Sequence, residues 1–292
     1  MIRFLWLIRR ELWEYRAAWI LPAVIGGLLV LAASFGHVDV DVAGARPGPD
    51  ALGGALLFGF GIVFLFVMLA YSSWYLLDCL NADRRDRSIL FWKSLPIGDA
   101  QTVIAKLATG LIAIPLIYFA AADVTTLAIA FIVSLRARAW IGNAMWHPGQ
   151  WLQLQALWLY LIATLAIWLL PVAGWLLLVS ASVRRATVLW SLLPPLAAVW
   201  VERVLLGTNW VGRILAIRLV DGYPATAFHD LSGSLLGAFG FPGASRAAAP
   251  ASVWALLAPL RFVAAPATWA GAAVGAVLIG VAIRVRVRNV DP

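Results

Sequence analysis

The chain has 292 residues, of which 63% are hydrophobic and 12% are charged, and its mean hydropathy is +0.90. A soluble domain is about 45–50% apolar and about 25% charged, so this composition excludes a soluble globular enzyme, a disordered protein and a fibrous repeat. The formal net charge of +8 does not indicate a nucleic-acid partner, because the basic residues lie between apolar runs and act there as topology signals. The composition predicts an all-α polytopic membrane protein with one transmembrane domain over residues 1–292.

Residues 1–16 are predicted to form an amphipathic helix ahead of the first span. Apolar side chains recur at helical spacing at Leu5, Ile8, Leu12, Tyr15 and Trp19. On another face, Arg10 and Glu14 stand one turn apart and can pair. We expect this helix to lie on the cytoplasmic interface of the membrane. The alternative is a plain N-terminal extension of the first span.

Six apolar runs are each long enough to cross the hydrocarbon core, which takes about 20 helical residues. These runs lie near residues 17–36, 51–77, 107–135, 151–183, 186–206 and 262–283. The fourth run is longer than a crossing requires, so we expect a tilt, or a kink near Pro171 and Gly174. An even number of spans places both termini on one side, and most of the lysines and arginines in short loops fall on that side. The sequence therefore predicts a multi-pass protein of a bacterial-type cytoplasmic (inner) membrane, with both termini in the cytoplasm.

The segment between the second and third spans, residues 78–106, is predicted to be a cytoplasmic loop. A dense patch of mixed charge at residues 83–87 precedes a short apolar stretch that contains Phe91 and Trp92. Pro96 and Gly98 end that stretch, and Asp99 is the expected N-cap of the helix that enters the third span. A short amphipathic helix with neighbouring aromatic residues suits a groove on a partner protein. The alternative is a basic loop that lies on anionic lipid head groups.

The external stretch before the last span, residues 207–261, is rich in glycine and proline. Its apolar pieces, residues 231–241 and 252–260, are too short to cross the membrane. Backbone that enters the membrane without crossing it must be covered by protein or face water, so we expect re-entrant helices here. The alternative is an unstructured external loop.

Three ionisable residues within or near the predicted spans are candidates for an intramembrane polar or gating role. Asp123 lies in the third span, and Glu202 and Arg203 lie near the outer end of the fifth. Glu202 and Arg203 diverge by about 100° on a helix and are poor partners for each other. Asp123 has no evident partner in the sequence, and a solvated helix end is the alternative reading of its position.

Motifs for catalysis do not occur in the chain. No GxxxxGK[ST] P-loop is present, and neither lysine follows a glycine. The three histidines, His37, His147 and His229, are far apart and fall in predicted external loops. No HExxH or GxSxG motif occurs, so the sequence predicts a protein that is not itself an enzyme.

The order of parts, and above all the loop NADRRDRSILFWKSLPIGDAQTVIAKL, resembles the permease subunit of type-2 ATP-binding-cassette (ABC) exporters. The resemblance implies a permease pair, expected here as a homodimer, and two copies of a separately encoded ATPase subunit that each dock through a coupling helix. It implies that ATP and Mg²⁺ are used by that partner and that this chain binds no cofactor. The residues that would couple to the ATPase are Arg84, Arg85, Asp86, Arg87, Ser88, Phe91, Trp92, Lys93 and Leu95.

Two other functions remain open on the sequence. An ion-gradient-driven secondary transporter would need ionisable residues near mid-bilayer, for which Asp123 is the candidate. A membrane-embedded transferase would need an acid, base or metal cluster at one interface, which the sequence does not display. The transported substrate is not indicated by any motif.

Overall fold

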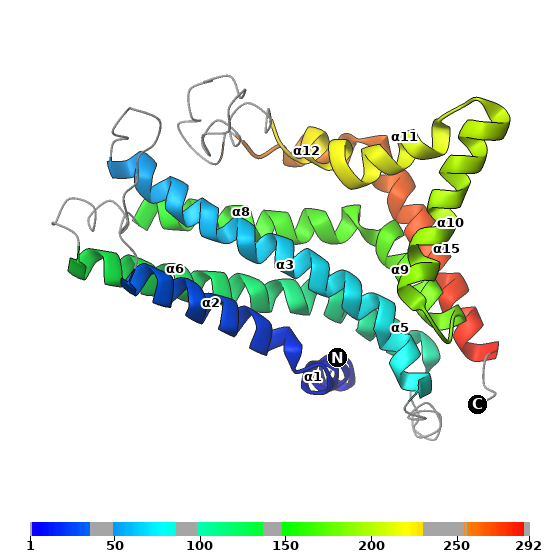
Figure 1. Cartoon of the computed structure of the whole chain (residues 1–292), viewed down its shortest axis with the longest axis horizontal. Helices are drawn as coiled ribbons and strands as arrows, with labels where there is room; N and C mark the ends of the chain where they lie inside the picture. The colour runs from blue at the N-terminus through cyan, green and yellow to red at the C-terminus, as the bar shows by residue number, and fades with distance from the viewer. Residues whose placement is uncertain are drawn as a thin grey trace.

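The computed structural model describes residues 2–35, 49–85, 98–136, 148–229, 254 and 256–288. All regular elements in these ranges are helices, which confirms the predicted all-α class (Figure 1). Six of the described helical segments are long and apolar enough to cross a membrane. They are Ala17–Phe35, Gly61–Arg85, Asp99–Ile132, Trp151–Trp168, Thr187–Leu206 and Pro266–Arg288. The chain therefore has the pattern of a multi-pass membrane protein.

The chain begins with helix α1, Ile2–Glu14, followed by the first candidate span, α2, Ala17–Phe35. Helix α1 has a buried side and an exposed side: Leu7 and Glu11 are buried, whereas Trp6 and Trp13 are exposed. The expected pair of Arg10 and Glu14 is formed, with 2.9 Å between Nη2 and Oε2. The helix over the first residues is thus present, and its location at a membrane interface stays a prediction.

Helix α3, Pro49–Arg85, is longer than the predicted second span. Residues 78–85, predicted as the start of a loop, are helical and form its last two turns. The helix continues because Tyr75, Cys79 and Asp83 recur one turn apart and are all buried, so that this polar end is packed rather than solvated.

The helix that contains the third candidate span begins at Asp99, within one residue of the predicted start of that helix. It consists of α5, Asp99–Ala108, a π-helical turn η1, Thr109–Ala113, and α6, Ile114–Arg136. The predicted N-cap was wrong, because Gly98 holds the N-cap position and no side-chain cap forms. Asp99 is the first helical residue, and its carboxylate accepts a hydrogen bond from Arg286 instead.

The predicted kink of the fourth span is confirmed. Helices α8, Pro148–Trp168, and α9, Leu170–Ser182, are separated at Leu169, whose φ is −84° and ψ 0°. Pro171 follows two residues later and supplies no backbone N–H to the helix. Helix α9 packs most extensively against the last span, α15, Pro266–Arg288.

The fifth span, α10, Thr187–Val201, continues through the π-helical turn η2, Glu202–Leu206. The stretch that follows, predicted to be external, contains α11, Trp210–Ala216, η3, Ile217–Asp221, α12, Gly222–Ala227, and α14, Pro259–Ala264. The first piece predicted as re-entrant, residues 231–241, lies outside the described residues. Of the second, the structure describes residues 254 and 256–260, with Leu257 bridged to Phe228. The re-entrant arrangement stays a prediction.

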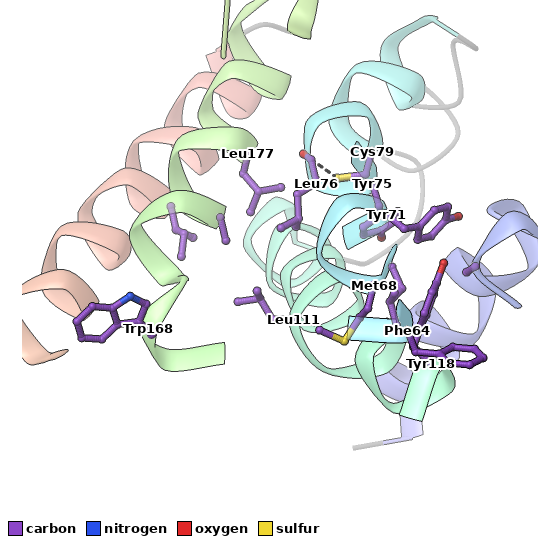
Figure 2. Packing of buried hydrophobic residues seen from close by; sticks show 14 of the residues in the cluster. Phe64, Met68, Tyr71, Tyr75, Leu76, Cys79, Leu111, Tyr118, Trp168 and Leu177 are labelled. Carbon is purple, nitrogen blue, oxygen red and sulfur yellow. Dashed lines mark hydrogen bonds between the residues drawn. The ribbon is translucent and has the colours of Figure 1, made fainter. Parts of the chain in front are cut away.

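The apolar core is centred on α3, where Phe64, Met68 and Leu76 are almost fully buried. In Figure 2, Leu76 lies beside Leu177 of α9 and Leu111 of η1, whereas Phe64 and Met68 lie nearer Tyr118 of α6. The core holds α3 between α6 and α9, and so fixes the places of the polar ends of α3 and α5.

Candidate functional site

Four charged side chains from four helices meet in the protein interior, close to the ends of α3 and α15. Glu11 comes from α1, Asp83 from α3, Lys106 from α5 and Arg286 from α15, and they are called the ion-pair cluster below. Their exposed fractions are 2%, 1%, 0% and 5%, respectively. Charged residues are almost never buried to this extent unless they are paired, so the cluster is the strongest candidate for a functional site in the described residues.

Lys106 is at the centre of the ion-pair cluster. Its Nζ lies 2.9 Å from both carboxylate oxygens of Glu11 and 3.2 Å from Oδ1 of Asp83. Arg286 binds the other side of Asp83, with 2.9 Å between Nη1 and Oδ2. The Nε of Arg286 lies 3.2 Å from Oδ1 of Asp99, which is partly exposed. The Tyr75 hydroxyl donates to Oε2 of Glu11 over 2.9 Å and completes the shell of that carboxylate.

The four buried charges sum to zero. Removing two carboxylates and two cations from water is costly, and the cost is offset only where every charge has a close partner, as here. What such an arrangement can do is fix α1, α3, α5 and α15 in one register, because displacing any one helix leaves a charge unpaired in a low-dielectric interior.

Polar residues at the end of α1 lie next to the ion-pair cluster. The Tyr15 hydroxyl donates to Oδ2 of Asp78 over 3.2 Å. Burial raises the pKa of this hydroxyl above its ordinary value. Burial also raises the pKa of the Glu14 carboxyl, an effect that the neighbouring Arg10 guanidinium opposes. The residue that follows α1 is thus held to α3 by a hydrogen bond from a hydroxyl to a carboxylate.

Of the residues predicted to couple to an ATPase, the structure describes two, at the end of α3. Arg84 points back into the protein, where its Nη2 donates to the carbonyls of Ser180 and Val183 at the end of α9. Arg85 is exposed, with its Nη1 3.9 Å from Oδ1 of Asp78. The others lie outside the described residues, and their role stays a prediction: Asp86, Arg87, Ser88, Phe91, Trp92, Lys93 and Leu95.

The three candidate gating residues are not brought together. Asp123 accepts a hydrogen bond of 2.6 Å from Nε2 of Gln155 on α8, a partner that the sequence did not suggest. The expected lack of pairing between Glu202 and Arg203 is found. Arg203 is exposed, while the Glu202 carboxylate accepts from the Thr208 hydroxyl at 2.8 Å. It also accepts from the amides of residues 210 and 211, at 2.6 and 2.7 Å, and so closes the turn before α11.

Sequence reasoning missed the ion-pair cluster as a unit. Lys106 and Arg286 were counted as topology signals, and Asp83 as part of a patch of mixed charge at the start of a loop. One signal was available: once the helix is taken to begin at Asp99, Lys106 lies two turns inside it among apolar neighbours, where a cation needs a buried anion.

Comparisons of this chain with protein-family models, with curated proteins and with solved structures found no match. The described residues also contain no group of three or more His, Cys, Asp or Glu side chains that could hold a metal ion. In the described part of the chain, the features that bear on function are therefore the helices and the ion-pair cluster.

Proposed function

We propose that the chain is the membrane-spanning permease subunit of an ATP-driven exporter of the type-2 ABC class. In this proposal two such permeases, identical to each other, form the translocation path, and two separate ATPase subunits dock at the cytoplasmic end. ATP and Mg²⁺ are used by the ATPase subunits, and the assembly resides in a bacterial-type cytoplasmic membrane. The observation that carries the proposal is the position of the ion-pair cluster beside the proposed docking loop.

That position supports a mechanical role. The proposed docking loop, residues 86–97, runs from the end of α3 to the start of α5, and charged residues close to both ends join the cluster. Asp83 lies just before the loop, and Asp99 just after it binds the same arginine, Arg286, as Asp83 does. A displacement of the loop is therefore expected to move α3 and α5 together with α1 and α15, rather than to bend one helix alone. The cluster supplies a contiguous network for transmitting the movement of a docked ATPase to the spans.

The test is affinity purification of the tagged chain from its native membrane, followed by mass spectrometry of the proteins that accompany it. We expect an ABC ATPase to co-purify with the chain, and we expect the chain alone to hydrolyse no ATP. Replacing Phe91 and Trp92 with alanine is expected to lower ATPase recovery by about tenfold or more, because aromatic anchors dominate the binding energy of such contacts.

The matched control removes a neighbouring pair of exposed apolar side chains elsewhere, at Trp200 and Val201 of α10. This variant should retain the ATPase. Recovery of no ATPase with the wild-type chain would overturn the proposal. Full recovery with the Phe91→Ala, Trp92→Ala variant would overturn the docking assignment alone.

A gradient-driven secondary transporter is the second candidate, favoured by the hydrogen bond between Asp123 and Gln155 across α6 and α8. Polar pairs within spans are common on ion pathways. Transport that survives ATP depletion, is abolished by a proton uncoupler, and is lost in an Asp123→Asn variant would favour this candidate over the ABC permease.

A further inference from the structure

A groove of about 560 Å³ lies where α1, the start of α2 and α6 meet. Its lining is apolar and aromatic apart from one arginine: Leu12, Trp13, Arg16, Trp19, Ile20 and Ile117. Ile117 belongs to α6, so the groove is bounded both by the N-terminal helix and by a helix of the bundle. This surface plays no part in the ion-pair cluster or in the proposed docking loop.

The charged side chain that lines the groove, Arg16, is a cation. Arg16 is exposed, and in the part of the chain that the structure describes no carboxylate pairs with it. Arg9 lies about two turns before Arg16 on the same side of α1. Its guanidinium is 6.0 Å from the Trp13 ring centroid and 5.0 Å from that of Trp6. Arg10, by contrast, is neutralised by Glu14. The outward face of α1 therefore presents two cations among exposed indole rings.

We infer that this groove binds an anionic glycerophospholipid, with an acyl chain against the apolar lining and the phosphate on Arg16. Indole rings and arginines with apolar stems collect at the level of the head groups, where arginine keeps its charged end among phosphates. The groove combines this pattern with a hydrophobic trough, which suits a lipid and does not suit a free phosphate ion. Charge complementarity selects an anionic head group over a zwitterionic one.

The position of the groove connects the lipid to the ion-pair cluster. Leu12 lines the groove, while its neighbour Glu11 lies about 100° around α1 and binds Lys106 in the interior. A lipid in the groove therefore holds α1 in the position in which Glu11 completes the cluster. This inference does not depend on an ATPase partner, and it would survive the failure of the proposed function.

The experiment is native mass spectrometry of the full chain in detergent after addition of phosphatidylglycerol or phosphatidylethanolamine with identical acyl chains. We expect the wild-type chain to carry more phosphatidylglycerol by about fivefold, the effect of one basic residue at a membrane surface. Arg16→Gln should remove this preference. Ile117→Phe keeps the arginine and fills the trough, and it should reduce the binding of both lipids.

Arg284→Gln is the matched control, because Arg284 is an exposed arginine near the end of α15 and lies outside the groove. It should behave as the wild type. Equal binding of the two lipids by the wild-type chain, or an unchanged preference in Arg16→Gln, would overturn the inference. So would a dimer mass with no dependence on the head group, which would indicate that a second copy of the chain covers the groove.

Discussion

Replacing Lys106 with methionine is expected to lower the free energy of unfolding by about 3–5 kcal/mol, the usual loss when one partner of a buried ion pair is removed. Methionine preserves the length and apolar stem of lysine, so the change isolates the charge. The substitution leaves the carboxylates of Glu11 and Asp83 buried without the ammonium group that lies 2.9 and 3.2 Å from them. The change can be measured by titration with sodium dodecyl sulfate in mixed micelles, followed by tryptophan fluorescence.

A double variant separates charge from packing. Lys106→Met combined with Glu11→Gln restores a neutral interior, since Asp83 keeps Arg286 and the Tyr75 hydroxyl can still donate to the new amide oxygen. We expect this double variant to be more stable than Lys106→Met alone by about 1–3 kcal/mol, as residues in one network do not behave additively. Arg284→Met, at an exposed site, should change stability by no more than about 0.5 kcal/mol. Additive losses in the double variant would contradict the assigned pairing.

Much of the fold follows from the length of apolar runs. The first span was placed at residues 17–36 and is found at Ala17–Phe35, because the run and the hydrocarbon core have matching lengths. The kink near Pro171 was also predictable, since proline removes a helical hydrogen bond regardless of the tertiary structure. These features depend on local sequence only.

The burial of the charged residues on α3 and α5 could not be predicted in this way. Whether Asp83 is solvated or buried depends on a cation that is 203 positions away in the sequence, Arg286. The central pair of the ion-pair cluster, Glu11 and Lys106, is likewise separated by 95 positions. From the local sequence, these charges are expected to lie in loops or at helix ends. They are buried because the four helices that carry them pack together and bring each charge next to an opposite one.

Replacing Gly275 with alanine is expected to lower the free energy of unfolding by about 1–3 kcal/mol, the usual cost of overpacking a tight interior. A Cβ at this position would lie 2.6 Å from the carbonyl carbon of Leu170 and 2.8 Å from the nitrogen of Pro171. Both are backbone atoms and cannot turn away as a side chain can. The contact is reciprocal, because a Cβ on Gly174 would lie 2.9 Å from the carbonyl oxygen of Gly275. Small residues allow this close approach of membrane helices.

The same helix supplies the control for this prediction. A Cβ on Gly280 would meet nothing within 4 Å, so Gly280→Ala should leave stability unchanged or raise it by up to about 1 kcal/mol through the better helix propensity of alanine. A loss of stability in Gly275→Ala without a loss in Gly280→Ala distinguishes a packing clash from a general effect on the helix. Equal changes in stability would contradict the close contact of α15 with α9.

Because Arg286 lies about three turns further along α15, a forced separation from α9 is also expected to displace it from Asp83. The coupling free energy between Glu11 and Lys106 is the departure of the double variant from the sum of the two single variants. Gly275→Ala should therefore reduce this coupling free energy, whereas Gly280→Ala should leave it unchanged.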